Sequence, residues 1–276
     1  MPRALPLSIA VVLAASAHAV ELPGDDDHAV PCRPTIACTA DLAAPGTLEI
    51  ELGYLLRRLA PATSQRTTPL LIKLTVTRWL QLQVATSGAV MTDDRAKSAY
   101  LDNINLGAKA HLRDQSLRAP SLSFSVAASV PSGAGPAGAA ATWGALFTLY
   151  VSKDVGWLHA DFNAGVILSR LEGAPLAQGF ITLALSTSLP RGFGLMLEGY
   201  AFGDASPSAG ADAGLLAAIC FQPRPWIVID AGGDLGILPA SRAGSLFAGV
   251  TIIPAVLWRK ARLVATTTIT PQHMSD

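Results

Sequence analysis

Three polar residues alternate with apolar ones in the stretch WLHADFNAGVIL (residues 157–168): His159, Asp161 and Asn163. These residue types act as general acids, bases and orienting groups in hydrolases. Nucleophilic catalysis would also need a serine within hydrogen-bond reach of the histidine. Residues two apart on a strand share a face but lie about 6.5–7 Å apart along it. The spacing therefore predicts a shared polar face, and catalysis is only one of the uses such a face could have.

The composition of the chain is unusual for a soluble protein. Of its 276 residues, 50% are hydrophobic and only 14% are charged, whereas soluble domains average about 25% charged residues. The formal net charge is zero, which argues against nucleic acid as the main partner. A chain so poor in charge either has a very large core or faces lipid.

The first residues have the pattern of an export signal. Arg3 precedes a short apolar run, and Ala17-His18-Ala19 fits a small-x-small cleavage site. We expect a signal peptide over residues 1–19, cleaved after Ala19, followed by a periplasmic segment over residues 20–44. A buried N-terminal helix is the alternative, and the run is too short to span a bilayer.

Two cysteines, Cys32 and Cys38, bracket the short stretch CRPTIAC. Exported chains meet oxidising conditions, so we expect a disulfide between them. A zinc site would need further ligands, and only His28 and the acidic residues 25–27 lie nearby. A solvated linker is the simpler interpretation of residues 25–28, and we predict neither a metal nor a cofactor.

Apolar and polar residues alternate with a period of two along most of the mature chain. Leu48, Ile50 and Leu52, for example, alternate with Glu49 and Glu51. Period two is the period of a β-strand. About twelve such segments of about ten residues each occupy residues 45–258. The connections between them alternate short and long, and the long ones are expected near residues 58–68, 86–102, 131–142, 170–179, 203–211 and 236–243.

An even number of strands, joined alternately by short turns and long loops, is typical of a bacterial outer-membrane barrel. Closure removes the unpaired edges that lipid would not tolerate. We therefore predict an all-β fold: a single transmembrane antiparallel up-and-down β-barrel of about 12 strands over residues 45–258, with a C-terminal tail over 259–276. Two features depart from such barrels, namely Pro254 in the last strand and the long tail beyond Trp258.

Ionisable residues keep one parity within these strands. A charge on the lipid face near the midplane costs about 2–4 kcal/mol, so this parity should face the lumen. His159 then lines the lumen, and we predict that the chain is not an enzyme. The predicted lumen-lining residues are Glu49, Glu51, Lys73, Lys109, His111, His159, Asp161, Asn163, Glu198, Asp230 and Asp234.

The five tryptophans fall near strand ends. The indole ring prefers the interface between lipid and water, so we predict an aromatic girdle; scattered core tryptophans are the alternative. The residues are Trp79, Trp143, Trp157, Trp226 and Trp258.

Several stretches resemble the outer-membrane barrels of the "MetA-pathway of phenol degradation" family. They are PGTLEIELGY (45–54), APSLSFSVAASVPSG (119–133), LYVSKDVGWLHADFNAGV (149–166), LPRGFGLMLEGYAFG (189–203) and ADAGLLAAICFQPRPWIVIDAGGDLGI (211–237). The resemblance covers most of residues 45–253. It implies an exported barrel that passes small, often aromatic or hydrophobic, solutes across the outer membrane, and it implies no catalytic residues.

These observations together predict a monomeric outer-membrane channel for passive passage of small solutes, with membrane lipid and a small-molecule solute as its partners. A barrel of about twelve strands has a limited interior, so we expect a narrow or nearly plugged pore. Two alternatives remain open: an outer-membrane barrel with a structural or lipid-hydrolysing role, and a secreted soluble β-sandwich that acts as a binding module.

Overall fold

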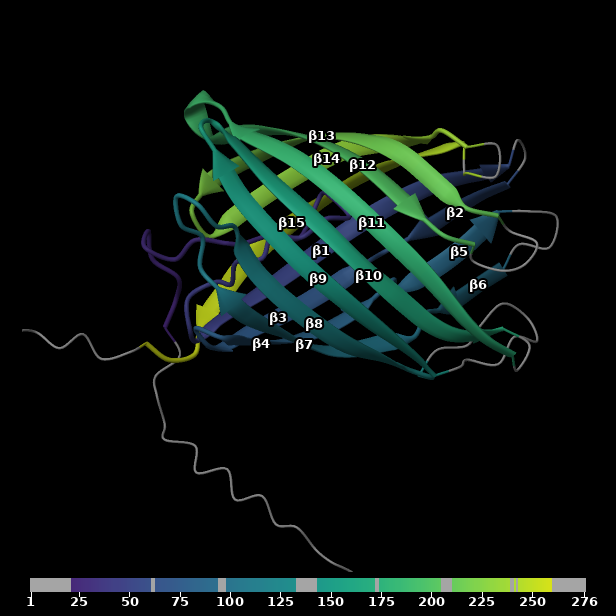
Figure 1. Ribbon diagram of the computed structural model, residues 1–276, viewed down its shortest axis with the longest axis horizontal. Helices are drawn as coiled ribbons and strands as arrows, with labels where there is room; N and C mark the ends of the chain where they lie inside the picture. Colours follow the sequence, from purple (N-terminus) through teal and green to yellow (C-terminus); the bar gives the residue numbers. More distant parts are fainter. Residues whose placement is uncertain are drawn as a thin grey trace, which may run out of the picture.

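The computed structural model describes residues 21–60, 63–93, 98–132, 143–171, 174–204, 210–238, 241 and 243–259. These residues form one antiparallel sheet that closes on itself, because β15 pairs with β1 (Figure 1). The predicted signal peptide and nearly all of the predicted C-terminal tail lie outside the described residues. In the part of the chain that is described, no helix is long and apolar enough to cross a membrane.

The sheet consists of 15 strand segments. They are β1 (Thr47–Ala60), β2 (Thr63–Thr67), β3 (Leu70–Thr77), β4 (Leu80–Thr86), β5 (Ala89–Asp93), β6 (Ser98–Leu101), β7 (Ile104–Arg113), β8 (Ser121–Val130), β9 (Gly144–Val155), β10 (Leu158–Leu171), β11 (Ala174–Ser188), β12 (Phe193–Phe202), β13 (Asp212–Arg224), β14 (Ile227–Gly236) and β15 (Gly244–Val256). A short 3-10 turn, η1 (Pro190–Gly192), joins β11 to β12.

Three of the barrel strands are each interrupted once, so the 15 segments make up a closed barrel of 12 strands. The pairs β2–β3, β4–β5 and β6–β7 are each the two parts of one strand. Backbone hydrogen bonds continue across the breaks, since Thr68 donates to Ser87 and Asp102 donates to Gly88. Gly88 has a φ of +68°, a conformation that favours glycine. The prediction of a single up-and-down barrel of about twelve strands is confirmed.

The prediction of long loops is wrong for three of the six ranges. Residues 58–68 and 86–102 contain β2, β5 and β6, which pair with one another and with the end of β1. The expected loop at 170–179 is also largely strand, because β10 and β11 continue to Leu171 and Ala174. Strand extensions of this kind need no apolar face, so their side chains do not alternate in the way that marked the other strands. Backbone pairing maintains them instead.

Pro254 does not prevent closure of the barrel. The register between β1 and β15 shifts between Leu48 and Ile50, opposite the stretch that contains Pro254, and pairing resumes at Ala255 and Val256. A bulge of this kind tolerates a residue that cannot donate a ladder hydrogen bond.

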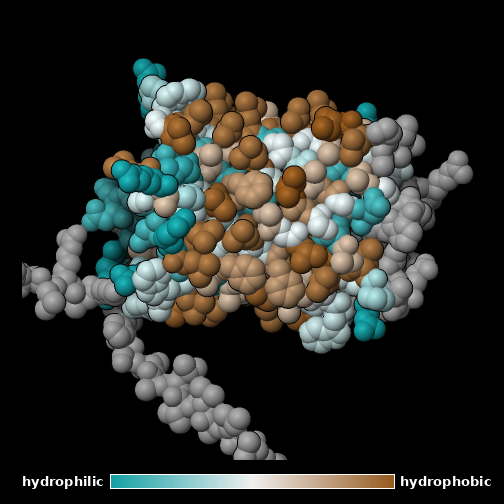
Figure 2. Space-filling model, viewed as in Figure 1, coloured by the Kyte–Doolittle hydropathy of each residue, from teal (hydrophilic) through white to brown (hydrophobic). Residues whose placement is uncertain are grey.

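The barrel is apolar outside and polar inside. Figure 2 shows hydrophobic residues over the middle of the outer wall and hydrophilic ones toward the short-turn end. On β1 the alternation is sharp: Leu52 is 47% exposed, whereas Glu49 and Glu51 are fully buried. This inversion of the usual burial pattern is typical of a barrel wall that faces lipid.

The chain before β1 enters the barrel. We expected a periplasmic segment over residues 20–44, but the structure places residues 29–43 against the inner wall, with Ala37 and Ala40 almost fully buried. Both described chain ends lie at the end of the barrel that carries the short turns (Figure 1). We call residues 29–43 the plug segment, and we call the two ends of the barrel the short-turn end and the long-loop end.

Candidate functional site

The plug segment is held by carboxylates of the barrel wall that accept hydrogen bonds from its backbone. Glu49 accepts the Val30 N–H at 2.7 Å, and Glu51 accepts the N–H groups of Cys32 and Arg33 at 2.9 and 3.1 Å. An extended peptide inside a barrel has no strand partner for its N–H groups, and a buried N–H without an acceptor is costly. Two predicted lumen-lining glutamates supply these acceptors.

Lys73, on the neighbouring strand β3, completes this cluster. Its Nζ lies 3.2 Å from Glu49 Oε2 and 2.7 Å from Glu51 Oε1, and it donates a hydrogen bond to the Val30 carbonyl. The pairing of β1 with β3 sets Glu49 directly opposite Lys73. One buried cation therefore pairs with two buried carboxylates and also holds the plug segment.

Glu198 and Asn163 bind the middle of the plug segment. The two carboxylate oxygens of Glu198 accept the N–H groups of Ile36 and Ala37 at 2.7 and 2.6 Å. The Asn163 side chain makes two bonds to Cys38, since its Oδ1 accepts the Cys38 N–H at 2.7 Å and its Nδ2 donates to the Cys38 carbonyl at 2.9 Å. These side chains come from β12 and β10, so the plug segment connects distant parts of the wall.

Arg33 lies in a recess of the wall and pairs with Asp230. Its Nη2 and Nε donate to the two Asp230 oxygens at 3.0 and 3.3 Å. A Cβ placed on Gly53 or Gly249 would come within 2.2 and 2.4 Å of the guanidinium atoms. Glycine at these two wall positions therefore creates the space that Arg33 occupies.

Lys109 and His111, both on β7, contact the last part of the plug segment. Lys109 Nζ donates to the Thr39 carbonyl and lies 4.4 Å from the centre of the Tyr150 ring, a distance suited to a cation–π contact. The His111 imidazole Nδ1 lies 3.2 Å from the Ala40 carbonyl. Both side chains are buried.

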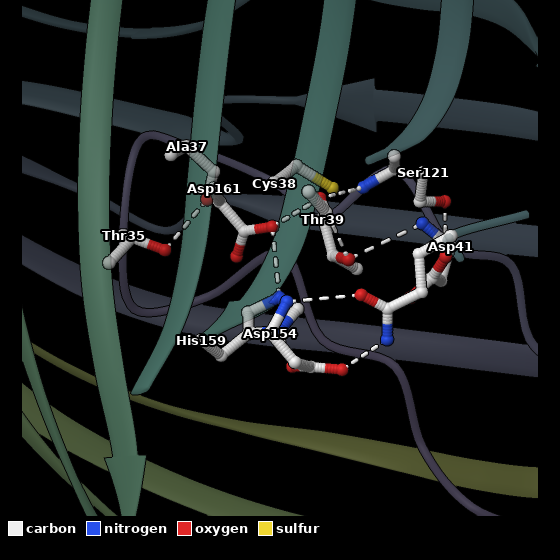
Figure 3. Close-up of polar contacts among 12 residues, drawn as sticks. Thr35, Ala37, Cys38, Thr39, Asp41, Ser121, Asp154, His159 and Asp161 are labelled. Atoms are coloured by element: carbon white, nitrogen blue, oxygen red, sulfur yellow. Dashed lines mark hydrogen bonds and ion pairs between the residues drawn. The ribbon is translucent and has the colours of Figure 1, made fainter. Parts of the chain in front are cut away.

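His159 and Asp161 of the stretch WLHADFNAGVIL join side chains of β9 in a polar chain between the plug segment and the short-turn rim (Figure 3). The Ala40 N–H donates to Ser152 Oγ at 2.6 Å, and Ser152 donates to Asp161. His159 lies between two carboxylates, with Nε2 3.1 Å from Asp161 and Nδ1 2.6 Å from Asp154. Ser152 contacts Asp161 and not the imidazole, so these residues do not have the arrangement of a nucleophile and its base.

A second histidine does make contacts of the Ser-His-Asp type, which the sequence did not predict. His111 Nδ1 lies 3.1 Å from Ser123 Oγ, and its Nε2 lies 2.7 Å from Asp114 Oδ1. Ser123 is fully buried beneath the plug segment and donates to the Ala40 carbonyl. No substrate reaches this hydroxyl while the plug segment is in place. Among the described residues, no three His, Cys, Asp or Glu side chains form a group able to hold a metal ion.

The structure thus brings most of the predicted lumen-lining residues to one object, the plug segment. His159 and Asp161 reach it only through Ser152. Asp234 lies apart, toward the long-loop end, and accepts a hydrogen bond from Tyr200 at 3.1 Å.

The tryptophans lie at the two ends of the barrel. Trp79, Trp157 and Trp226 are in short turns, and Trp258 follows β15 at the same end. Trp143 precedes β9 at the long-loop end. Trp79, Trp143 and Trp157 are 43%, 65% and 74% exposed, whereas the other two are half-buried.

Part of the inner wall of the barrel carries apolar side chains. Inward positions of several strands near the long-loop end carry large apolar or aromatic side chains. Leu216, Ala218 and Phe247 are buried together, and Leu55 and Met196 pack against them. Nearby, the rings of Phe180 and Phe202 stack with their centres 5.5 Å apart.

Cys32 and Cys38 form a disulfide within the plug segment. The loop between them carries the N–H groups that Glu51 and Glu198 accept. Closing a loop of this length lowers the conformational entropy of the unfolded chain, which stabilises the folded segment by about 2 kcal/mol.

We expect Cys32→Ser/Cys38→Ser to raise the hydrogen-exchange rate of the Arg33, Ile36 and Ala37 amides by about thirtyfold. Mass spectrometry of the full chain in detergent measures this rate, and Cys220→Ser is the matched control; equal exchange in both variants would contradict the prediction.

Asp27 anchors the chain where it enters the barrel. It is 4% exposed, so the expected solvated linker is wrong at this position. Burial favours the neutral carboxyl, but hydrogen bonds from Arg259 and from the Gly24 N–H outweigh burial and lower the pKa of Asp27. Arg259 also donates to Glu21 at 2.6 Å.

This lowered pKa of Asp27 predicts a pH dependence. A carboxyl whose folded pKa is depressed stabilises the folded contact at pH values above its unfolded pKa, and this stabilisation is lost as the pH falls through the folded pKa. We expect residues 21–28 to become more susceptible to limited proteolysis when the pH is lowered from 7 to about 2, measured with a protease that is active at each pH. In Asp27→Asn the susceptibility should already be high at pH 7, and a variant that still shows the full pH response would contradict this assignment.

The plug segment is the feature that sequence reasoning missed. Its contacts run through backbone N–H groups, which leave no pattern in the side chains. One signal was present: the inward positions carry more carboxylates than lysines, and a narrow lumen needs donors to satisfy them. Arg33 and the backbone of the plug segment supply those donors.

No family model and no curated protein matches the chain. Solved structures with the same fold do exist. The COG4313 outer membrane channel from Pseudomonas putida F1 superposes with a TM-score of 0.63 at 11% sequence identity, over 77% of this chain and 97% of that one. The NanC porin gives a TM-score of 0.50 at 8% identity, over 74% of this chain and 98% of that one. The chain therefore has the barrel fold of these outer-membrane channels.

Proposed function

We propose that this protein is a monomeric outer-membrane channel whose lumen is closed on the periplasmic side by its own N-terminal segment. The observation that carries the proposal is the row of wall side chains that bind the backbone of the plug segment. Those side chains come from strands all around the barrel, so one continuous segment crosses the lumen. Displacement of this segment opens the path for passive passage of a solute.

The outer membrane is the compartment that fits the barrel best. Its outer wall carries an apolar belt, and the ionisable side chains at the level of this belt lie inside, an arrangement that is stable in lipid. The signal-like residues 1–19 and the resemblance to the MetA-pathway family support the same location. The soluble β-sandwich has no support in a closed barrel with an exposed apolar belt.

We base the solute class on the apolar part of the inner wall. Its apolar and aromatic lining, which includes Phe180, Phe202, Leu216 and Phe247, favours small apolar or aromatic solutes over sugars or ions. The polar contacts deeper in the lumen are already occupied by the plug segment.

Recording from the purified full chain in planar lipid bilayers tests the proposal. We expect rare, brief openings and uptake of small aromatic solutes into proteoliposomes. A total lack of conductance and uptake, both in the full chain and in variants with a weakened plug segment, would refute the channel function. A phospholipase assay of the wild type and of His159→Ala addresses the lipid-hydrolysing alternative.

A further inference from the structure

A groove near the long-loop end is lined by residues of β14, β15, β1 and β2, most of which belong to the outward set of their strands. Its volume is about 490 Å³. Strand register explains its shape. Leu246 lies opposite Gly233 on one side and Leu56 on the other, and Arg58 lies opposite Gly244. The two glycines have no side chains to fill the wall beside the leucine and the arginine.

The strand parity places the charged side chains of this groove outside the barrel. On β1, Glu49 and Glu51 point inward, so Arg58 belongs to the outward set with Leu52, Tyr54 and Leu56. Arg58 is the first charged residue of that outward set. It therefore marks the height at which the apolar belt of β1 ends.

Arg66 on β2 lies beside it. Leu56 pairs with Arg66 and Arg58 pairs with Ser64, so the two arginines are diagonal neighbours on one face. Diagonal positions lie about 7–8 Å apart, within reach of two long side chains that converge on one group. Both arginines are exposed. Leu235 and Leu246, which also line the groove, are 67% and 66% exposed.

We propose that this groove binds a phosphorylated lipid of the outer leaflet. The guanidinium groups of Arg58 and Arg66 bind the phosphate, because the planar fork of arginine matches phosphate geometry. The exposed leucines below them pack against an acyl chain. Two observations favour this occupant: the positive charge at the upper edge of the groove, and its continuity with the apolar belt. The inference rests on the proposed location in the outer membrane.

Other ionisable groups around the groove also affect the expected affinity for an anionic lipid. Asp93 on β5 pairs with Ser64, so it lies on the same outer face, diagonal to Arg66. It opposes an anionic ligand, and its removal should strengthen binding. Arg57 and Asp234 also border the groove, but they belong to the inward set and have partners of their own.

Lipid binding to the full chain in detergent tests the inference. The probe is diphosphorylated lipid A, and native mass spectrometry measures the bound fraction during titration. Arg58→Gln/Arg66→Gln should weaken binding by at least about tenfold, and Asp93→Asn should strengthen it severalfold. The matched control is Arg170→Gln, an exposed arginine of β10 at the same end of the barrel but away from the groove, which should leave binding unchanged.

Three outcomes would overturn the inference: equal lipid affinity in the double variant and the wild type, equal binding of a lipid that carries no phosphate, or displacement of the lipid by millimolar inorganic phosphate. Conductance recorded from the same preparations separates this inference from the proposed function. If the double variant still forms channels and binds lipid A as the wild type does, only the lipid site is refuted. If no preparation forms channels, the proposed function itself fails.

Discussion

Glu198→Ala/Asn163→Ala should convert a mostly closed barrel into a conducting channel. Glu198 accepts the N–H groups of Ile36 and Ala37, and Asn163 makes two bonds to Cys38. A hydrogen bond to a charged group contributes about 1.5–3 kcal/mol, and a neutral one about 1 kcal/mol. Loss of both side chains removes the attachments of the middle of the plug segment but leaves its first contacts intact.

The expected result is a rise in open probability of at least about tenfold in single-channel recordings. Ser125→Ala is the matched control, because Ser125 is also a buried lumen side chain but bonds the hydroxyl of Tyr150 at 2.9 Å. The control should conduct like the wild type. If the double variant folds and stays as closed as the wild type, Glu198 and Asn163 are not what keeps the lumen shut.

The fold was predictable because lipid imposes a simple rule on side chains. A wall with lipid outside and polar groups inside must alternate, so residues such as Leu52 and Glu51 reveal both the strand and its orientation. Beyond the part of the wall that contacts lipid, the side chains no longer need to alternate. β2, β5 and β6 continue the strands beyond the apolar belt, and their sequences resembled loops for that reason.

The candidate site was predictable only in part. Parity identified Glu49, Glu198 and Asp230 as inward residues, but it said nothing of what they bind. Glu49 and Glu198 accept backbone N–H groups of the plug segment, which every residue except proline has, and Asp230 pairs with the side chain of Arg33. Sequence therefore revealed the acceptors and could not reveal the donor. The recess for Arg33 was equally hidden, since Gly53 and Gly249 carry no mark of the side chain that fills it.

Strand parity shows which side chains point inward but not what they bind. For this reason His159, Asp161 and Asn163 first suggested catalysis. Polar residues of one strand face look alike whether they bind a substrate, water or a peptide. Only the contacts separate these uses. Asn163 binds Cys38 directly, whereas His159 and Asp161 connect the wall behind it to the short-turn rim. The three residues act at different distances from the plug segment.

Lys73→Met should be among the most destabilising single substitutions in the barrel. Lys73 is 2% exposed and lies within ion-pair distance of Glu49 and Glu51, which are themselves buried. Removal of one partner from a buried ion pair costs about 3–5 kcal/mol, because the remaining charge is left without compensation. Here two carboxylates would lose their cation at once. The free energy of unfolding, measured by urea titration of the refolded barrel in detergent, should fall by at least this amount.

A rescue variant separates charge from packing. Lys73→Met/Glu49→Gln/Glu51→Gln removes all three charges, and the glutamine carbonyls can still accept the Val30 N–H and one of the two N–H groups that Glu51 binds. Buried ion clusters replaced as a whole by uncharged residues often lose little stability, so most of the loss should be recovered. Lys153→Met is the control, since Lys153 lies at the short-turn rim and donates to turn carbonyls, and a change within about 0.5 kcal/mol is expected there. A triple variant as unstable as Lys73→Met would mean that the shape of the lysine, and not its charge, holds this end of the plug segment in place.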